Sequence, residues 1–476
     1  MKKFLLTLLL CLLFLPAGLA EEPGRLYPAM DDETGLWGYI DGNAEWAIPP
    51  QFDWADVFRG DYAMVELYPA EYEASRLLYY DCEGIIDRAG NWVLPPEYSL
   101  DAGYDGKFFG GRDTGIWLVW KNSDVVWGED EEGEKTLLSD SLEGFFDIPS
   151  GCFSGLKWDG VWPWCSDSRL IPVIDQNGAG YADRSTGDVV IPCQFFAYDP
   201  SNFYEGVASV AYPDADGNAG DFFLIDETGA EIPLPEGIHS VYGWGAEGGR
   251  VRITDGKLYG YADLTGRILV EPQYAAIYED TDEGTSWVEF PEGDEGFADR
   301  DGQVIRRGLE ALKWWHVGLN SGYYARETGD NEITLYTLAG EEQFILRSEN
   351  LVRLNMPMAN GLCWFETDPS GEPQAYLYRR WGLVDLQGRV VSEAQWVLKD
   401  FEARDFSDGL QLAGIPMADI GVSWGFIDAS GQWVIEPIWD RAESFEDGLA
   451  WVRQGKKVGY IDRTGREVFA WQKDEP

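Results

Sequence analysis

The sequence of 476 residues contains little histidine and little positive charge. It has two histidines, His239 and His316, and its 36 Lys and Arg residues face 84 Asp and Glu residues, which gives a formal net charge of -48. Such a chain repels the phosphates of nucleic acids and of anionic membranes, so we expect no nucleic-acid partner. Because 45% of the residues are hydrophobic and 14% are aromatic, the composition still predicts a folded protein.

The scarcity of histidine also argues against nucleophilic catalysis. Neither histidine lies in a G-x-S-x-G or H-E-x-x-H motif, and a serine or cysteine nucleophile needs a base that a third group holds in place. Carboxylates are so numerous that two of them close together say nothing about glycoside hydrolysis. We therefore predict a protein that is not an enzyme and uses no cofactor.

Long apolar segments are absent except at the N-terminus. Residues 1–20 read MKKFLLTLLLCLLFLPAGLA, with two lysines, an apolar run and small residues at the end. This order is typical of a secretory signal peptide, and we expect cleavage after Ala20. No later segment is apolar enough to span a bilayer. We expect a secreted or cell-surface, extracytoplasmic monomer that does not insert into the membrane after cleavage.

Cysteine is also rare, and no C-x-x-C pair suggests a zinc site. Cys152 and Cys165 are close in the sequence and are the best candidates for a disulfide, which the expected compartment permits. Three further cysteines, whose redox state stays open, follow the signal peptide: Cys82, Cys193 and Cys363.

The segment between Cys152 and Cys165 is rich in tryptophan. It reads FSGLKWDGVWPW, and Trp158, Trp162 and Trp164 are our candidate binding residues. Their rings either stack on a sugar or a peptide or cover one end of a sheet, and we favour the second interpretation.

What the sequence has in abundance is a repeat. An apolar pair, an aspartate and then a glycine recur at intervals of roughly 42 residues. The anchoring aspartates are Asp41, Asp87, Asp183, Asp226, Asp263, Asp299, Asp385, Asp428 and Asp462. The intervals after Asp87 and Asp299 are about twice as long as the others. The second contains a degenerate copy with Thr337 in place of the aspartate, and the strand-like pattern around Trp120 suggests a remnant in the first.

Each copy predicts a meander of three short strands. Asp-x-x-Gly fits a tight turn in which the aspartate caps backbone N–H groups and the glycine takes the left-handed position. We expect the proline that follows to end the third strand, because it has no N–H to donate. The glycine before the aromatic residue, such as Gly38 or Gly425, is expected to receive a large ring from a neighbour. Most tryptophans are predicted to be core, because one meander alone buries too little surface to be stable.

These motifs resemble a known family. Leu36-Trp37-Gly38-Tyr39-Ile40-Asp41, followed by Ile48-Pro49-Pro50-Gln51-Phe52-Asp53, is similar to the WG repeat, also called the KWG repeat, a β-rich module found in tandem in many bacterial proteins. Trp381-Gly382 and Trp424-Gly425 carry the same dipeptide. The resemblance implies a tandem β-repeat array, and the family has no general catalytic residue to transfer.

We therefore predict an all-β fold, a tandem array of roughly 42-residue three-stranded antiparallel meanders, either a curved solenoid or propeller-like. An open superhelix is favoured over closed rings. The expected regions are N-terminal repeats (21–100), an irregular insert (101–170), central repeats (171–305), a degenerate region (306–375) and C-terminal repeats (376–476).

One acidic loop is a candidate calcium site. Asp214, Asp216, Asn218 and Asp221 alternate as hard-cation ligands do, but no glutamate closes the loop, so we favour a lengthened hairpin without a metal.

As function we predict an interaction scaffold for a protein or glycan ligand. The alternatives are a glycan-active hydrolase of the cell envelope on a propeller-like scaffold and a purely structural surface spacer.

Overall fold

The computed structural model describes residues 24–68, 81–101, 115–121, 126–129, 135–139, 142–163, 168–197, 201–241, 246–281, 284–309, 312, 317–319, 321–369, 379–398, 406–417 and 421–472. The predicted signal peptide, residues 1–20, lies outside these ranges. Throughout them the regular elements are strands, and no helix that could cross a membrane occurs there. The predicted all-β class is confirmed.

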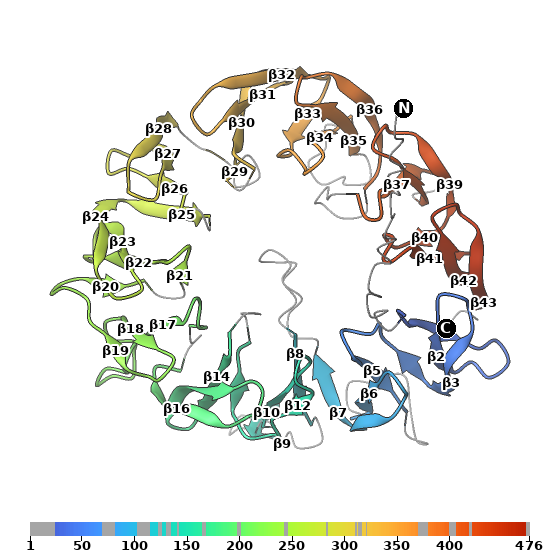
Figure 1. The fold of residues 1–476 in the computed structure, drawn as a ribbon, viewed down its shortest axis with the longest axis horizontal. Helices are drawn as coiled ribbons and strands as arrows, with labels where there is room; N and C mark the ends of the chain where they lie inside the picture. Colours follow the sequence, from blue (N-terminus) through green and yellow to red (C-terminus); the bar gives the residue numbers. More distant parts are fainter. Residues whose placement is uncertain are drawn as a thin grey trace, which may run out of the picture.

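In the part of the chain that the structure describes, eleven units of antiparallel sheet follow one another around a ring (Figure 1). Each unit contains a first, a central and a third strand in chain order. The first strands are β1 (Tyr27–Met30), β5 (Tyr62–Glu66), β8 (Ile116–Trp120), β14 (Leu170–Asp175), β17 (Val207–Val210), β22 (Arg250–Thr254), β26 (Ser286–Glu289), β30 (Tyr323–Gly329), β34 (Leu362–Thr367), β37 (Gln411–Pro416) and β41 (Leu449–Gln454). The central strands are β2 (Trp37–Ile40), β6 (Glu83–Asp87), β11 (Gly144–Asp147), β15 (Gly178–Asp183), β18 (Phe223–Asp226), β23 (Tyr259–Asp263), β27 (Glu295–Ala298), β31 (Glu332–Thr337), β35 (Arg380–Asp385), β38 (Val422–Ile427) and β42 (Lys457–Asp462). The third strands are β3 (Trp46–Phe52), β7 (Trp92–Asp101), β12 (Cys152–Phe153), β16 (Val189–Phe195), β19 (Glu231–Ile232), β24 (Ile268–Tyr274), β28 (Val304–Leu309), β32 (Glu342–Arg347), β36 (Val390–Trp396), β39 (Trp433–Trp439) and β43 (Glu467–Gln472).

Many units gain a further short strand that the sequence did not predict. These strands are β4 (Trp54–Ala55), β13 (Gly160–Val161), β20 (His239–Ser240), β21 (Ala246–Glu247), β25 (Ala276–Asp280), β29 (Val317–Gly318), β33 (Leu351–Leu354) and β40 (Arg441–Ala442). They pair with the first strand of their unit. In Figure 1 the strands β29 to β32 follow one another from the inside of the ring to its rim.

The extra strand arises where the chain bends from one unit into the next. The long strand β7 pairs with β6 through residues such as Leu94 and then with β8 through Ser99 to Asp101. A single residue, Asp440, connects β39 of unit ten to β40 of unit eleven. Neighbouring sheets are therefore joined by a continuous or nearly continuous strand.

The connection between the central and the third strand is the predicted aspartate turn. In unit eleven, Asp462 Oδ1 accepts hydrogen bonds from the backbone N–H groups of Thr464 and Arg466, at 2.9 and 3.1 Å. Gly465 has a φ of 82°, and its N–H donates to the carbonyl of Asp462. The carboxylate bonds recur at Asp41, Asp87, Asp226, Asp263, Asp299, Asp385 and Asp428. This part of the prediction is confirmed.

The glycine of the central strand is explained by backbone, which corrects the prediction of a neighbouring ring. A β-carbon at Gly38 would lie 2.5 Å from the carbonyl oxygen of Ile48 and 2.7 Å from the nitrogen of Pro50. At Gly260 and Gly425 the third strand approaches in the same way. A side chain is excluded because the third strand of the same unit crosses this point.

The proline position is also corrected. Pro49 and Pro50 lie inside β3, and pairing resumes after them, since Tyr39 pairs with Ile48 and Trp37 with Phe52. The register shifts between these two pairs, which makes a β-bulge. Proline is tolerated there because the ladder bonds are interrupted at the bulge.

The described residues form eleven core clusters, each shared by two units that are neighbours around the ring. One of them joins the first unit to the last: Trp37 packs edge-on against Trp471, with ring centroids 5.8 Å apart. The Tyr460 hydroxyl donates to the carbonyl of Pro28 at 3.0 Å. The ends of the array are therefore in contact, and the preference for an open superhelix is corrected.

Two units were hidden in the regions predicted to be irregular or degenerate. In unit three the anchor is the buried Asp147, which follows Gly144-Phe145-Phe146 and accepts from the N–H of Ser150 at 3.1 Å. In unit eight Thr337 serves in place of the aspartate, because its hydroxyl accepts from the N–H of Glu341 at 3.1 Å. The strand-like pattern around Trp120 is β8, whereas β9 (Val126–Glu129) and β10 (Lys135–Ser139) form a separate hairpin.

Candidate functional site

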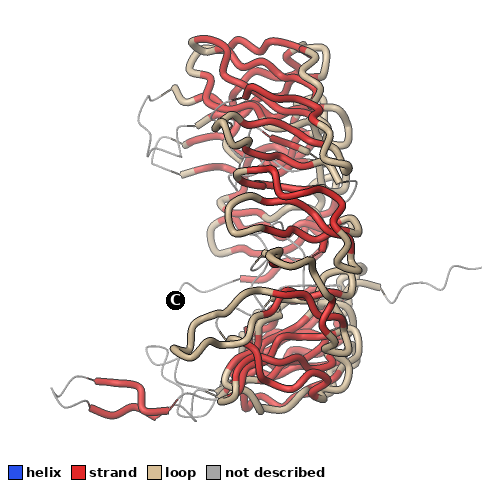
Figure 2. Tube along the Cα trace, turned by 90° about the vertical axis from the view of Figure 1, so that its left-hand side faces the viewer, coloured by secondary structure: helices blue, strands red, loops and turns tan. Residues whose placement is uncertain are grey.

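The two faces of the ring differ in their connections. Strands in a meander alternate in direction, so the connections between first and central strands lie on one face and those between central and third strands on the other; we call them the loop face and the turn face. The connections between central and third strands, on the turn face, have four or five residues, such as residues 41–45 and 463–466. On the loop face they range from residues 455–456 to residues 121–143. Figure 2 shows the two-stranded hairpin in the longest of them projecting from the array.

The carboxylates of the turn face are occupied by their own turns. The pKa of Asp263 is lowered to about 2 by hydrogen bonds from the Thr265 side chain and from backbone and side-chain groups of Thr265 and Arg267. The pKa of Asp462 is lowered for the same reason. These groups are held as anions by donors of the fold.

A second set of turns precedes the first strands on the same face. Three of them place an acidic residue with positive φ before a glycine: Glu205-Gly206, Asp408-Gly409 and Asp447-Gly448. Both positive φ values make them type I′ hairpin turns. The Asp408 carboxylate accepts from the backbone N–H of Gly448 in the next unit, at 2.7 Å. The Glu205 carboxylate does the same for Gly249, at 2.7 Å. These turn acids link consecutive units.

Arg25 makes the corresponding link where the ends of the array meet. It lies before β1, at the place that a turn glycine has in unit eleven, and its guanidinium binds Glu446 and Asp447, each at 2.7 Å. The Tyr27 hydroxyl donates to the carbonyl of Asp447 at 3.2 Å. The last turn is thus tied to the first unit by a side chain in place of a backbone amide.

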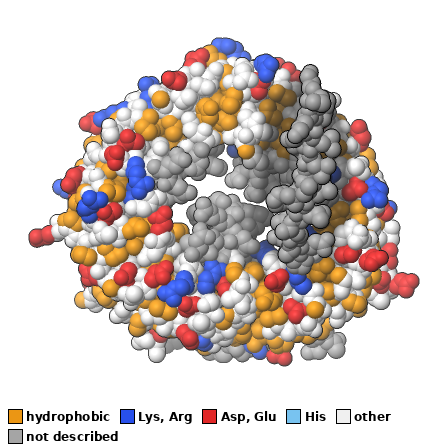
Figure 3. Space-filling model, in the orientation of Figure 1, with side chains coloured by type: hydrophobic (Ala, Val, Ile, Leu, Met, Phe, Trp, Pro, Cys, Tyr) orange, Lys and Arg blue, Asp and Glu red, His pale blue; other side chains and the backbone are white. Residues whose placement is uncertain are grey.

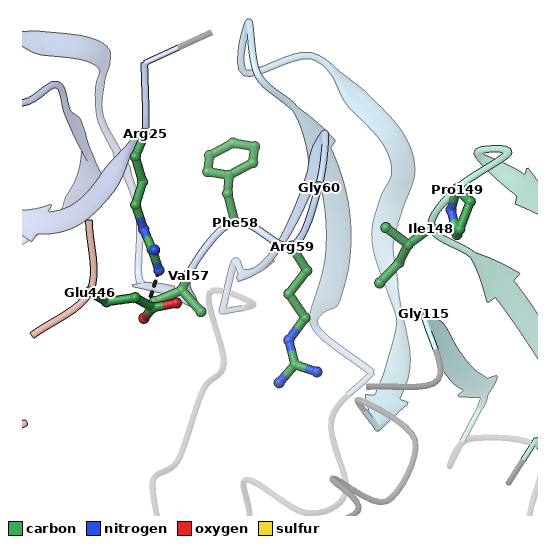
Figure 4. Close-up of a pocket in the computed structure, with 9 residues that line it drawn as sticks. All are labelled: Arg25, Val57, Phe58, Arg59, Gly60, Gly115, Ile148, Pro149 and Glu446. Carbon is green, nitrogen blue, oxygen red and sulfur yellow. Dashed lines mark ion pairs between the residues drawn. The ribbon is translucent and has the colours of Figure 1, made fainter. Parts of the chain in front are cut away.

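A cleft of about 410 Å³ opens beside this link (Figure 4). Its lining comes from units one, two, three and eleven: Arg25, Val57, Phe58, Arg59, Gly60, Gly115, Ile148, Pro149 and Glu446. Figure 4 shows the Arg59 side chain extending between Glu446 on one side and Ile148 on the other. The cleft therefore combines two guanidinium groups and one carboxylate with apolar walls.

Only two of the three predicted binding tryptophans lie in the described residues. Trp158 is 3% exposed and stacks on Phe145 with ring centroids 5.6 Å apart, inside the cluster between units three and four. It is core, which corrects its assignment as a binding residue. Trp162 is half-buried, and Trp164 lies outside the described residues.

The candidate calcium loop is a hairpin that uses its own carboxylate. Asp214 Oδ1 accepts from the backbone N–H groups of Asp216 and Asn218, at 2.9 and 2.8 Å. Asp221 lies 3.9 Å from the imidazole of His239. In the part of the chain that the structure describes, no three His, Cys, Asp or Glu residues come together as metal ligands.

The cysteines carry no nucleophile motif. Cys82 and Cys363 are buried, and burial raises the pKa of each thiol to about 12. Cys152 and Cys193 form no disulfide with another described cysteine. Cys165 lies outside the described residues, so the disulfide between Cys152 and Cys165 stays a prediction. His316 lies outside them as well.

Three groups at the cleft were not singled out from the sequence: Arg25, Arg59 and Gly60. The signal that could have found Gly60 is its position, because the turn it starts has Gly-Asp where the other turns have an acidic residue and glycine. The opening itself depends on contacts between the first and last units, which no local pattern reveals.

Comparison with known proteins agrees with the repeat. A family model described as WG containing repeat matches residues 37–68, 84–100, 259–290 and 424–457. No curated protein matches the chain.

Solved structures give only distant similarity. A crystal structure of the eukaryotic initiation factor is 10% identical, with 77% of this chain and 94% of that chain covered and a TM-score of 0.38. Porphyromonas gingivalis dipeptidyl peptidase 4 is 10% identical over 84% of this chain and 63% of that chain, with a TM-score of 0.36. Citrobacter koseri AztD is 11% identical over 66% and 92%, with a TM-score of 0.31. Such low scores carry no conclusion about function.

Proposed function

Because the chain belongs to the proteins built from WG-containing repeats, we propose that it is a non-enzymatic scaffold that binds a protein or glycan partner through its loop face. The observation that carries the proposal is the contrast between the two connections within each meander. Residues 121–143 and 211–222 are long connections between first and central strands, whereas every connection between a central and a third strand has four or five residues. A rigid frame with variable loops on one side is how many binding surfaces are built.

The surface and the turn carboxylates support binding over chemistry. Acidic, basic and hydrophobic side chains are interspersed over the face seen in Figure 3. The aspartates that recur in most repeats are bonded within their turns. A scaffold needs no reactive group.

The proposal is tested with the mature chain, residues 21–476, on glycan and peptide arrays. A variant in which residues 211–222 are replaced by the two-residue turn of 455–456 should lose a ligand that contacts this loop and keep its melting temperature. A matched change on the turn face, Asp428→Asn, should leave ligand binding intact. Retention of every ligand after all the long loops have been shortened one by one would contradict the proposal.

The two alternatives give different results in the same experiment. An envelope hydrolase releases product from an array glycan, and neutralising one carboxylate abolishes that release. A structural spacer shows no saturable ligand at all.

We also propose that the protein acts outside the cytoplasm, which rests on the composition of residues 1–20. Mass spectrometry of the protein from a secreting host should find Glu21 as the mature N-terminus. An intact Met1 on the exported or retained protein would contradict cleavage after Ala20.

A further inference from the structure

One hairpin of the loop face stands apart from the eleven units. The strands β9 and β10 form a sheet of two strands, and among the described residues neither pairs with a strand of any unit. They lie in the connection 121–143 between β8 and β11, and Figure 2 shows them projecting from the array. The hairpin is therefore an appendage of the loop face and not a part of the repeat.

A sheet of two strands is marginally stable when it stands alone in water. Independent stability needs three or more strands with an apolar face, or packing against another element. The sequences of the two strands, VWGE and KTLLS, contain Val126, Trp127 and Thr136, which are residue types that favour strands. A third strand would complete a sheet of the size that is stable.

The two edges of the hairpin differ in how well they suit a further strand. The register shifts in β10 between Leu137 and Ser139, so Leu138 is an extra residue that makes a β-bulge. A bulge twists the strand that contains it and protects its edge from further pairing. The strand β9, Val126–Glu129, is paired without such a shift and contains no proline. A strand that adds to this hairpin should therefore pair with β9.

The charge of this part of the chain indicates which kind of strand fits. Residues 124–140 contain seven Asp and Glu residues and one Lys, which gives a formal net charge of -6. A second copy of the chain brings the same segment and a total charge of -48, so repulsion opposes pairing between two copies. A strand with lysine or arginine residues is attracted instead, and charge complementarity of this kind selects between partners.

We propose that the hairpin binds a basic, extended segment of a partner protein, which pairs with β9 as a third strand. In strand addition of this kind the backbone hydrogen bonds along the edge supply affinity, and the side chains supply selectivity. The inference rests on the loop-face function proposed above, because it names the partner of that face as a polypeptide and β9 as the strand to which the partner binds.

The test uses the mature chain, residues 21–476, at about 150 mM salt with two fluorescent peptides. One is acetyl-Lys-Val-Thr-Val-Lys-Val-Thr-Lys-amide, and the other has Glu in place of each Lys. The Lys peptide is expected to bind at least about tenfold more tightly than the Glu peptide, because several exposed charge pairs add to that ratio. Equal affinities, or no saturable binding of the Lys peptide, would overturn the proposal.

Amide hydrogen exchange shows whether the peptide adds as a strand. In the free protein, exchange in β9 and β10 should be faster than in β8 and β11. Saturating Lys peptide should slow exchange in β9 by about tenfold or more. Binding of the peptide with unchanged exchange in β9 would mean that charge alone attracts it, and the proposed strand addition would be wrong.

A variant and a matched control locate the site. Gly128→Pro removes an N–H from β9 and should weaken binding of the Lys peptide about tenfold or more, because proline is excluded from paired strands. Its melting temperature should stay at the wild-type value, since β9 lies outside the eleven units. The control is Ala215→Pro in the loop-face hairpin 211–222. Ala215 follows Asp214 in a turn closed by the N–H of Gly217, a position that accepts proline, and binding should be unchanged.

Failure of this inference can be distinguished from failure of the loop-face function. An array ligand that is lost when loop 211–222 is shortened, and that Gly128→Pro leaves bound, upholds the loop-face function while equal binding of the two peptides refutes this inference. The absence of any saturable ligand refutes both. A dimer of the free protein that Gly128→Pro dissociates would replace the basic partner by a second copy of the chain. If Gly128→Pro is unstable, the exchange measurement on the wild-type protein still decides.

Discussion

At the scale of single residues, the glycine of the central strand is the most constrained position of the repeat. Its α-carbon lies against the backbone of the third strand, which cannot move aside without breaking the bulge. We expect Gly38→Ala to lower the free energy of unfolding by about 3 kcal/mol, as overpacking against rigid neighbours does. Urea unfolding followed by tryptophan fluorescence measures the change.

A glycine in the same unit provides the control. A β-carbon at Gly42 would meet nothing within 4 Å, and its φ is not positive. Gly42→Ala should therefore change the free energy of unfolding little. Similar losses for the two substitutions would show that the third strand does not cross at Gly38.

The aspartate turns make a second prediction at this scale. The pKa of Asp263 is about 2 in the fold and about 3.9 in an unfolded chain. The contribution of this carboxylate to stability is therefore complete above about pH 3.9 and is lost as the pH falls through about 2. Asp263→Asn should lower the free energy of unfolding by about 1 kcal/mol at pH 7. The difference between variant and wild type should disappear near pH 2, which urea titrations at both pH values can show.

Asp301→Asn is the matched control, because Asp301 is an exposed carboxylate in the equivalent turn of unit seven, where only its backbone N–H bonds to Asp299. It should change stability little at either pH. An equal loss for both variants would mean that the cap itself contributes nothing.

At the scale of elements, the repeat could be predicted because each turn carries its own chemistry. Aspartate and glycine at fixed spacing specify the reversal after the central strand, and this prediction holds even at Thr337, where a hydroxyl replaces the carboxylate. The predicted role of Gly38 was wrong because the repeat period does not indicate whether an aromatic ring or a backbone segment approaches this glycine. Pro50 was misplaced because a bulge and a strand end look alike in sequence.

The element that escaped prediction was the third unit. Its anchor Asp147 is followed by a glycine four residues later, at Gly151, and the connection before its central strand holds the β9–β10 hairpin. The long insertion lengthens the interval between the anchors, so the repeat period could not be recognised there. The cleft escaped for a different reason, because it requires units one, two, three and eleven together, and the contact between the first and last units has no local signature.

At the scale of the whole molecule, buried carboxyl groups and capped aspartates have opposite effects on how stability changes with pH. Glu83 lies opposite Glu66 on neighbouring strands. Burial, with the nearby charges of Glu66, Asp81 and Asp101, raises its pKa to about 7. Its folded pKa exceeds the unfolded value of about 4.3, so protonation favours the fold and stability should rise as the pH falls from 7 towards 4.5.

Below about pH 4 the aspartates of the unfolded chain become protonated while the capped aspartates of the fold stay ionised, so stability should fall again. The maximum therefore lies between about pH 4 and 5. Glu83→Gln should raise the free energy of unfolding at pH 8 by up to about 3 kcal/mol and flatten the profile between pH 7 and 4.5. If the Glu83→Gln variant keeps the wild-type slope of stability against pH in that interval, the slope comes from another group.

The closure of the ring is the property on which the cleft depends, and it can be tested through one tryptophan. Trp471 is 2% exposed and packs against Trp37 of the first unit. Trp471→Ala should remove about 3–5 kcal/mol of packing, and amide hydrogen exchange should accelerate in β1–β3 as well as in β40–β43, because both sheets share that cluster.

Trp396, 1% exposed in the cluster between units nine and ten, is the matched control. Trp396→Ala should accelerate exchange in those two units and leave β1–β3 as in the wild type. If Trp471→Ala loosened only the last unit, the ends of the array would not be in contact in solution. Arg25 would then have no fixed partner at Glu446, and the cleft would lose one of its walls.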